Sequence, residues 1–467
     1  MTSKEINRHD ALREADISSV MHPFTNLVAH GQVGPDIIER GEGIRIFDAS
    51  GRSYIDAMAG IWSNGLGNGE ERLIKAADAQ YRKLAYYHTF AHKSNPPSIE
   101  LASKLLSMLP VPMSKVFFCS SGSEAVDTAI KTVWYYWNAN SRRTKKKIIS
   151  RRRAYHGVNV ASGSATGLPL LHNEFDLPIA QIIHTSSPHY WKEAKPGESE
   201  DEFSTRLAQE LEDLIKREGA ENIGAMIAEP LMGAGGVIVP PKGYFPKIQA
   251  VLKRNEILLI ADEVICGFGR TGKMFGTETF DIKPDLMTFA KQLSSSYFPI
   301  GAVAVSELVF DVIKEASARL GNFGHGYTYS GHPVGAAISL EALKIYEERD
   351  VVGQVQKSSA HFFKRLHELE RHPYVGEVRG VGLIAAVELV ADKKKRLLFN
   401  PLGKINALVA RRAYENGLVT RALPASDSLG FCPPLFSTIS ELDEIVDLFA
   451  KTIDELTPQM KEHAGSQ

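Results

Sequence analysis

The sequence predicts an α/β protein built around a mostly parallel, seven-stranded sheet flanked by helices. Between about residues 70 and 335, continuous apolar runs typical of strands buried on both faces alternate with stretches of helical periodicity. This alternation implies parallel strands joined by helical crossovers. The length of 467 residues, with 43% hydrophobic and 23% charged residues, is ordinary for two or three globular domains.

Seven apolar runs form the predicted sheet. They lie at residues 116–119, 148–150, 181–184, 225–228, 258–261, 286–289 and 301–305. A helix is expected over residues 123–138, where Val126 and Ile130 recur at helical spacing. Residues 203–218 show the same spacing and end before Gly219, which is a suitable stop.

The two ends of the chain have a different pattern. Residues 44–51 and 53–58 alternate in polarity around Gly51, which predicts a hairpin. After a long predicted helix over 332–349, further helices are expected at 354–371 and 404–416, with strands at 380–389 and 417–423. We therefore expect a second, α+β unit in the C-terminal part.

The charge balance and the cysteine content restrict the function. The chain has 54 Lys and Arg residues against 55 Asp and Glu residues, which argues against a dedicated nucleic-acid binder. Three cysteines cannot form a disulfide framework and fit a reducing compartment. The chain shows no signal-peptide core and no apolar run of membrane-spanning length. We expect a cytoplasmic protein with neither a membrane nor a nucleic-acid partner.

A first candidate site is the segment FFCSSGSEAVDTAI, where a buried-type strand meets a helix start. A helix N-terminus offers free N–H groups and a positive dipole end, both of which suit a phosphate. Ser121 and Ser123 could add hydroxyl donors, and Gly122 permits close backbone approach. Taken alone, a simple N-cap box with Glu124 is the favoured interpretation of this segment.

A second candidate is NEILLIADEVICGFGRTG, which brings Asp262 and Glu263 to the end of an apolar strand. A buried carboxylate there requires a cation or a strong donor, although a helix cap or an internal Arg pair would also satisfy it. The glycines of GFGRTG match a dinucleotide fingerprint only weakly, because no periodic helix follows them.

Two basic features complete the candidates. Lys291 directly follows a buried-type strand, where a lowered pKa would make its amine available for a Schiff base. Alone, a lysine that extends its amine to solvent is the favoured interpretation. The basic run at 141–153 fits two solvated flanks around a strand.

Together these residues resemble one family. The segment ADEVICGFGRTGKMFGTETFDIKPDLMTFAK resembles the signature of class III aminotransferases that use pyridoxal 5′-phosphate, including the spacing from Asp262 to Lys291. The resemblance extends through SSGSEAVDTAIK, RRAYHG, AEPLMGAGGVIVPPKGYF, GYTYSGHPVGAA, VRGVGLIAAVEL and CPPL. The segments HPFTN, AGIWSNGLG, YYHTF and GLVTRAL are most similar to the omega-amino-acid or amine:pyruvate branch. Serines 294–296 replace the family's usual glycines, and GLGNGEERL replaces its usual aromatic–Gly–His stretch.

The resemblance implies the family's fold, named fold type I. It has a large domain with a seven-stranded sheet and a small α+β domain formed from both chain ends. The expected bounds are 1–69 and 336–467 for the two parts of the small domain, and 70–335 for the large cofactor-binding domain. The resemblance also implies a homodimer with shared active sites.

The resemblance further implies a role for particular residues. Lys291 would form the Schiff base with the cofactor and move the proton at the reacting carbon. Asp262 would pair with the pyridine nitrogen, and Glu229 would support Asp262. The other expected cofactor contacts are Ser121, Gly122 and Ser123 at the phosphate, Tyr155 and Val264 on the two ring faces, and Thr328 from the neighbouring subunit.

The expected substrate pocket contains Trp62, Phe90, Ala234, Ile265 and Arg421. For Trp62 and Phe90, core packing is an equal alternative. Arg421 would turn in for a carboxylate and out for an apolar group, on a flexible segment that continues through the loop at 424–427; a surface pair with Asp427 is the alternative. No metal ligand is expected.

The leading functional prediction is transfer of an amino group from an omega-amino acid or primary amine to pyruvate, giving L-alanine and an aldehyde or ketone. The alternatives are a taurine, β-alanine or 4-aminobutyrate transaminase, use of 2-oxoglutarate as acceptor, or an aminomutase of the glutamate-1-semialdehyde type. Outside the transferases, the weak GFGRTG fingerprint leaves a nicotinamide-dependent oxidoreductase open.

Overall fold

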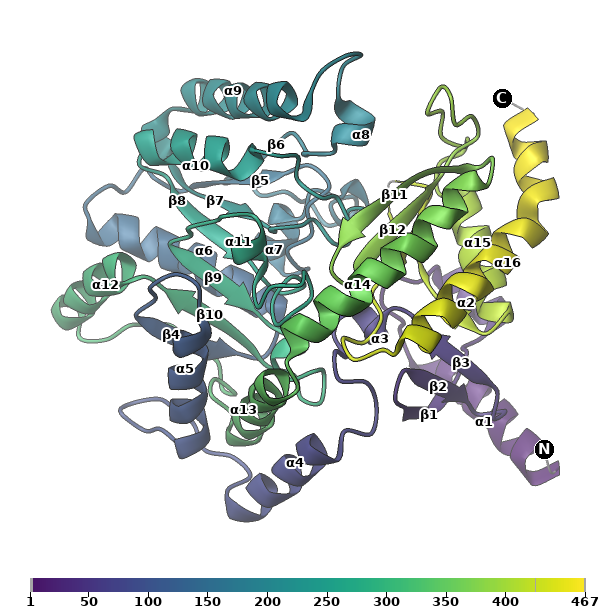
Figure 1. Cartoon of the computed structure of the whole chain (residues 1–467). Coiled ribbons are helices and arrows are strands. Elements are labelled where there is room, and N and C mark those ends of the chain that lie inside the picture. Colours follow the sequence, from purple (N-terminus) through teal and green to yellow (C-terminus); the bar gives the residue numbers. More distant parts are fainter. Residues whose placement is uncertain (1–2, 425, 466–467) are drawn as a thin grey trace.

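A seven-stranded mixed sheet forms the centre of the computed structural model, which describes residues 3–424 and 426–465 (Figure 1). The strands follow the order β4 (Lys115–Cys119), β10 (Gly301–Val305), β9 (Leu286–Phe289), β8 (Leu258–Asp262), β7 (Ile223–Ala228), β5 (Lys147–Arg151) and β6 (Ile182–Thr185). Strand β10 is antiparallel to both of its neighbours, and the other neighbouring pairs are parallel. The seven predicted strands are confirmed, with ends that differ by at most two residues.

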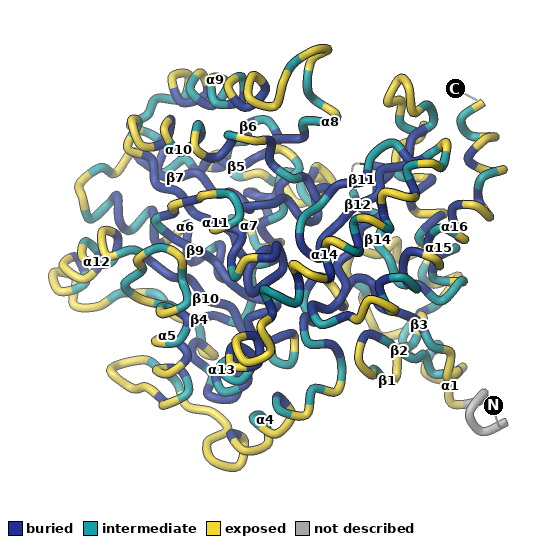
Figure 2. Tube along the Cα trace, viewed as in Figure 1, coloured by how far each residue is buried: buried dark blue, intermediate teal, exposed yellow. Residues whose placement is uncertain are grey.

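Helices cover both faces of this sheet because side chains alternate along each strand. Ile148 and Ile260 face one apolar core, whereas the adjacent Ile149 and Leu259 face another. The first core is covered by α6 (Gly122–Ala139), α7 (Val160–Ala165) and α12 (Glu307–Leu320). The second is covered by α5 (Pro96–Met108), α9 (Glu200–Glu218), α10 (Tyr244–Arg254) and α13 (Pro333–Glu348). Figure 2 accordingly shows the strands as the most deeply buried part of this layered unit.

A second sheet joins the two ends of the chain. It has the order β1 (Ile38–Glu42), β2 (Arg45–Asp48), β3 (Ser53–Asp56) and β13 (Leu418–Val419). The predicted hairpin around Gly51 is confirmed as the antiparallel pair β2 and β3. Strand β13 pairs with β3 in parallel, so segments more than 350 positions apart share one sheet.

A third, antiparallel sheet completes this smaller part of the molecule. Its order is β11 (Val375–Val381), β12 (Ile384–Leu389), β15 (Ser428–Phe431) and β14 (Arg421–Ala422). The helices α14 (Val351–Glu368), α15 (Lys404–Glu415) and α16 (Ile439–Gly465) pack beside it, as Figure 1 shows. The remaining elements are α1 (Ser3–Ser19), α2 (Leu27–Val33), α3 (Ala59–Trp62), α4 (Glu71–Lys83), α8 (Tyr190–Glu193), α11 (Gly276–Thr279) and four 3₁₀ turns at 169–171, 220–222, 291–293 and 369–371.

Two of the predicted C-terminal strands are wrong as single elements. The strand expected at 380–389 divides at Gly380 and Gly382, whose positive φ values of 149° and 62° turn the chain from β11 into β12. The strand expected at 417–423 divides into β13 and β14, which belong to different sheets. Tertiary pairing therefore overrides a continuous local pattern in both places.

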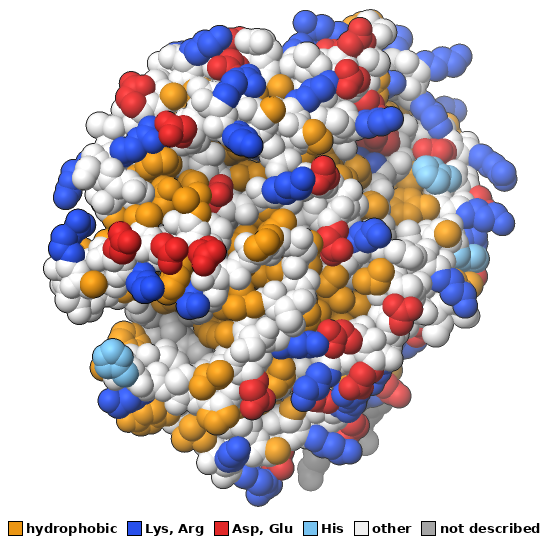
Figure 3. All heavy atoms as spheres, turned by 60° about the vertical axis from the view of Figure 1, so that its left-hand side comes forward, with side chains coloured by type: hydrophobic (Ala, Val, Ile, Leu, Met, Phe, Trp, Pro, Cys, Tyr) orange, Lys and Arg blue, Asp and Glu red, His pale blue; other side chains and the backbone are white. Residues whose placement is uncertain are grey.

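Charge is mixed on the surface. On the face in Figure 3, basic and acidic side chains lie interspersed among hydrophobic ones. Among the described residues, no helix is both long enough and apolar enough to cross a membrane.

Candidate active site

A cavity of about 130 Å³ lies at the carboxyl ends of β7, β8 and β9, the edge where open α/β sheets place their ligands. It is lined by Gly122, Ser123, Tyr155, His156, Gly157, Glu229, Asp262, Val264, Ile265, Ala290 and Lys291. Ser121 borders a second, more open cavity that also reaches Lys291. The structure thus brings together most of the residues that the sequence predicts for cofactor binding.

Asp262 ends strand β8, and its carboxylate is buried. Its Oδ1 accepts hydrogen bonds from the Val264 backbone N–H and from the Thr288 hydroxyl, each at 3.1 Å. Its Oδ2 lies 2.7 Å from Nδ1 of His156. These three contacts hold the carboxylate in one orientation at the cavity wall, where it can pair with a protonated ring nitrogen.

His156 is a site residue that the sequence analysis did not identify. Its side chain is fully buried, and its backbone N–H donates to the Thr166 hydroxyl at 2.8 Å. Its Nε2 is a buried atom for which the described residues supply no hydrogen-bond partner. The only local signal is its place next to Tyr155 in AYHG, because its partner Asp262 is 106 positions away.

Glu229 follows β7 and organises the turn beneath the cavity. Its Oε1 accepts from the Tyr155 N–H at 3.1 Å, and its Oε2 accepts from the Gly233 N–H at 2.8 Å. Burial raises the pKa of this carboxyl above its ordinary value. Glu229 therefore positions Tyr155 and the loop that carries Ala234, while it touches neither oxygen of Asp262 by a hydrogen bond within the described part of the chain.

Glu263, although adjacent to Asp262, does not line the cavity. Its carboxylate accepts from the backbone N–H groups of Gly276 at 3.0 Å and Thr277 at 2.6 Å. Burial raises its pKa to about 7. Of the two acidic candidates after β8, only Asp262 therefore belongs to the site.

Lys291 follows β9 by two residues and has a positive φ of 50°, a left-handed conformation that turns its side chain toward the cavity. Within the described residues, its amine has neither a hydrogen bond nor an ion pair. Burial lowers the pKa of this amine to about 8. An uncommitted amine with a lowered pKa has the properties of a nucleophile.

The start of α6 forms the other end of the cavity. Ser121 is the N-cap, and its hydroxyl accepts from the Glu124 N–H at 3.1 Å, so the predicted capping arrangement is present. Gly122 and Ser123 begin the helix and face the cavity. A Cβ at Gly157 would lie 2.9 Å from Cα of Ser123, so glycine is needed for this close approach. The arrangement leaves backbone donors and a hydroxyl at the positive end of a helix.

The predicted substrate residues are only partly brought to this cavity. Ile265 lines it, and Ala234 is buried on the loop whose Gly233 lies against the Ile265 side chain. Trp62 is buried in the same apolar cluster as Ile265 and Leu423. Its indole Nε1 has no hydrogen-bond partner among the described residues.

Phe90 and Thr328 lie outside this cavity of their own chain, and both are exposed. Their segments are joined, because the Tyr86 hydroxyl donates to the Thr328 carbonyl at 2.6 Å and the Thr89 hydroxyl donates to the Ser330 carbonyl at 3.2 Å. The aromatic side chains of Tyr86, Phe90 and Tyr329 are exposed there. Neither residue therefore lines this cavity in its own chain.

Arg421 differs from the flexible-segment expectation. It belongs to β14 and pairs with Gly430 of β15, so its backbone is held in a sheet. Asp427, the alternative partner, accepts instead from the Gly403 N–H at 3.0 Å. Ala425 of the expected loop lies outside the described residues. The guanidinium has no hydrogen bond or ion pair with the described residues, and it is close enough to Tyr155 and Lys291 to influence the pKa of both.

Comparison with known proteins gives a consistent result. Residues 28–453 match the family model described as Aminotransferase class-III. A curated relative, Gamma aminobutyrate transaminase 1 of Solanum lycopersicum, is 48% identical over 99% of this chain and 91% of its own length. A probable gamma-aminobutyrate transaminase 3 of Oryza sativa subsp. indica is 48% identical over 96% of this chain and 88% of its own length.

Solved structures are also similar. The omega transaminase of Pseudomonas jessenii in complex with PMP is 52% identical, has a TM-score of 0.95, and covers 96% of this chain and 99% of its own. A structure described as a transaminase with L-ala is 54% identical, with a TM-score of 0.89 over 91% of this chain and 100% of its own.

Proposed function

The chain belongs to the class III aminotransferases, and from this premise we propose that it transfers an amino group from an omega-amino acid or a primary amine to pyruvate, giving L-alanine. The observation that carries the proposal is the guanidinium of Arg421, which has no hydrogen-bond or ion-pair partner among the described residues and lies near a cavity lined by apolar Ile265. Pyruvate and alanine carry a carboxylate next to the reacting carbon, whereas a simple amine has an apolar group there. An arginine without a resident partner can bind the first and turn away from the second.

Class III aminotransferases depend on pyridoxal 5′-phosphate, which supplies an electron sink when it is bound. The residues around the cavity fit this cofactor. The start of α6 offers donors for its phosphate, and Asp262 offers a fixed carboxylate for its ring nitrogen. A Cβ at Gly122 would lie 3.2 Å from Val264, so a larger residue there would narrow the space between them.

The proposed roles of the chain's own groups follow from this placement. The amine of Lys291 would hold the cofactor and then take the proton from the substrate's reacting carbon, for which a pKa of about 8 suits its neutral form. Asp262 would keep the ring nitrogen protonated, and His156 would hold Asp262 in position. Tyr155 would lie against the ring, positioned by the bond from its N–H to Glu229.

A related engineered enzyme supports the substrate pocket. A variant of the thermostable omega transaminase PjTA-R6, engineered for bulky amines, has a tryptophan, a phenylalanine and an arginine replaced. The three positions are separated by 28 and 331 residues, which are also the separations of Trp62, Phe90 and Arg421 here. We infer that these three side chains limit the size and charge of the substrate.

The exposed positions of Phe90 and Thr328 support a homodimer. We infer that a second copy covers the aromatic surface formed by Tyr86, Phe90 and Tyr329, and that Thr328 of one copy then reaches the phosphate of the other. Mixing Lys291→Ala with Thr328→Ala chains should yield hybrid dimers with one intact site and measurable activity. Inactive hybrids, in the presence of dimers by light scattering, would contradict the shared site.

Transfer from 4-aminobutyrate is the second candidate, since several curated relatives are named as its transaminases. A panel of 4-aminobutyrate, β-alanine, taurine and 1-phenylethylamine, each tested with pyruvate and with 2-oxoglutarate, separates the possibilities. We expect the highest kcat/KM with pyruvate as acceptor. A clear preference for 2-oxoglutarate would reject the proposed acceptor but keep the reaction class. The cytoplasmic location stays a prediction, and some of these relatives are named as mitochondrial.

The role of Arg421 has its own test. Arg421→Ala should weaken the binding of alanine and pyruvate about ten- to hundredfold. A hydrogen bond to a charged group contributes about 1.5–3 kcal/mol, and the variant loses such a bond. The half-reaction with 1-phenylethylamine, which has no carboxylate, should change little. Arg411→Ala, at an exposed position of α15, serves as the control. Equal losses for both substrates would show that Arg421 is structural.

A further inference from the structure

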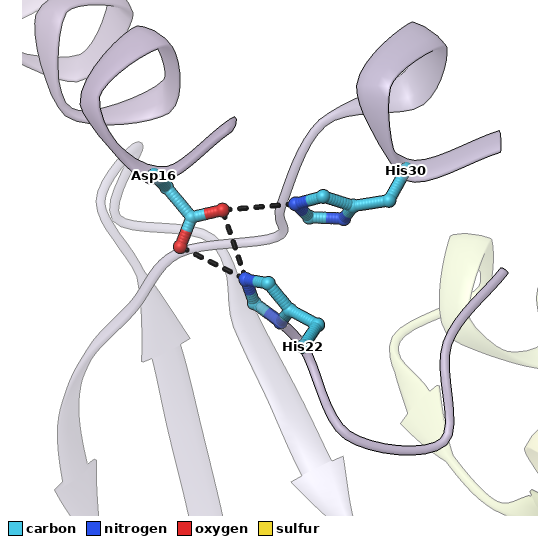
Figure 4. Close-up of side chains that lie close together, drawn as sticks. All are labelled: Asp16, His22 and His30. Atoms are coloured by element: carbon cyan, nitrogen blue, oxygen red, sulfur yellow. Dashed lines mark hydrogen bonds and ion pairs between the residues drawn. The ribbon is translucent and has the colours of Figure 1, made fainter. Parts of the chain in front are cut away.

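The N-terminal arm, defined here as residues 8–33, contains a cluster that the aminotransferase reaction does not use. Asp16 of α1, His30 of α2 and His22 of the connecting loop point toward one another (Figure 4). Oδ1 of Asp16 lies 2.9 Å from Nε2 of His22 and 2.9 Å from Nε2 of His30. The two imidazole rings lie 4.2 Å apart between centroids. Three potential ligand atoms thus converge on one point.

We propose that this cluster is a binding site for a divalent transition-metal ion, such as Zn²⁺, that holds α1 against α2. The three ligand atoms all lie within 4.8 Å of one another. Atoms bound tetrahedrally to zinc at 2.0–2.1 Å are roughly 3.3 Å apart. The Asp16–histidine distances of 2.9 Å therefore need to open by only a few tenths of an ångström.

The chemistry of the three side chains suits such an ion. Imidazole nitrogen is a preferred ligand of zinc, and a carboxylate adds a negative charge. Both histidines present Nε2, and each neutral ring can carry its proton on Nδ1, which frees the Nε2 lone pair. The hydrogen bonds that now join the rings to Asp16 would be replaced by metal bonds, and a water molecule would complete the coordination.

The position of the cluster explains what the ion would do. None of the described side chains of the arm in α1 or α2 is buried, so no apolar core fixes these helices to each other. Apart from the cluster, the contacts of α1 with the following segment include Arg13 with the Pro35 carbonyl at 2.8 Å and Arg8 with Glu39 at 2.7 Å. Where apolar burial is insufficient, metal binding can supply the stability of a small unit.

The side chains are accessible enough for an ion to enter, with exposed fractions of 20% for Asp16, 29% for His22 and 10% for His30. The sequence analysis expected no metal ligand, and positions 16, 22 and 30 match no familiar ligand spacing.

The first test measures zinc on the holoenzyme. Full-length protein is dialysed with ZnCl₂, and bound metal is measured by mass spectrometry and by titration calorimetry. We expect one zinc per chain. The zinc affinity should be at least hundredfold lower in His22→Ala, His30→Ala and Asp16→Asn, because loss of a residue that only supports a metal ligand already lowers metal affinity about 10–100-fold. His9→Ala is the matched control, because His9 lies on α1 with a side-chain exposure of 28%, close to that of His22. Cofactor content and transamination rate should be unchanged in all four variants, which checks that each is folded.

A second measurement tests the effect on the arm. Phe24, in the loop between α1 and α2, is exposed and offers a chymotrypsin site. Zinc should slow cleavage there about tenfold or more in the unaltered chain and in His9→Ala, and have no effect in His22→Ala. Zinc content that is the same in the unaltered chain and the cluster variants, or the absence of binding at micromolar zinc, would overturn the site. Bound zinc with unchanged cleavage would overturn its role in holding the two helices together.

Discussion

Replacing His156 with alanine should separate positioning of Asp262 from simple packing. The variant loses the 2.7 Å contact from Nδ1 to Oδ2 of Asp262, while the Val264 N–H and the Thr288 hydroxyl still hold Oδ1. The carboxylate then gains freedom to rotate away from the ring nitrogen. We therefore expect the proton-transfer step to slow more than cofactor binding weakens.

The magnitude follows from the type of bond removed. A hydrogen bond to a charged group contributes about 1.5–3 kcal/mol, and 1.36 kcal/mol corresponds to a factor of ten in rate. The rate of the half-reaction with a saturating amine should fall about ten- to hundredfold, with a much smaller change in KM. The free energy of unfolding should also fall, because the variant leaves a buried cavity and an incompletely paired carboxylate.

Rapid-mixing absorbance of the bound cofactor measures this half-reaction directly. His184→Ala is the control, since His184 on β6 is half-buried and, like His156, has a buried Nε2 without a partner among the described residues. Burial lowers the pKa of His184 to about 4, and His184 does not contact Asp262. Equal slowing in both variants, or a near-normal rate in His156→Ala, would refute the positioning role.

Three further outcomes are expected. The rate at which pyridoxal 5′-phosphate binds again to the apoenzyme should rise about tenfold per pH unit up to about pH 8 and then level off, because the pKa of Lys291 is about 8. A rate that continues to rise to pH 10 would contradict this prediction. Native Glu263, with a pKa of about 7 against an ordinary 4.5, retains a proton that the unfolded chain releases, so its contribution to stability falls as pH rises from about 4.5 to 7. Glu263→Gln should therefore flatten the dependence of Tm on pH in that window, and an unchanged slope would exclude this origin. Gly157→Ala should weaken cofactor affinity at least tenfold, because the added methyl group displaces Ser123. Gly321 also has a positive φ but has open space around it, so Gly321→Ala should leave the affinity unchanged. Equal losses of affinity in a cofactor titration would show that backbone strain alone is responsible.

The central sheet could be predicted from the sequence because its strands are buried on both faces. Continuous apolar runs mark such strands without any tertiary information, and all seven were located within two residues. The strand at 417–423 could not be divided correctly in the same way. Its two halves have similar local patterns, and only their distant partners Ile55 and Gly430 assign them to different sheets.

The site shows the same division between local and distant information. Asp262 and Lys291 each follow an apolar strand, so the sequence places both at one sheet edge. His156 carries no comparable signal, because its role depends on a hydrogen bond across 106 positions. Arg421 was expected on a flexible segment because its neighbours include Pro424, yet pairing with Gly430 fixes its backbone in β14. Movement of Arg421 therefore has to come from its side-chain torsions.

Local sequence patterns carry less information about the substrate than about the reaction class. The groups proposed for proton transfer, Lys291 and Asp262, lie at the ends of strands of the central sheet, and those strands carry a clear local sequence pattern. The groups proposed to limit the substrate, Trp62, Phe90 and Arg421, come from three segments outside that sheet, and one of them is exposed in the single chain. Their mutual geometry depends on how the small sheets pack and on what covers Phe90. The reaction class can thus be predicted from a strand pattern, whereas the preferred amine depends on an assembled surface and has to be measured.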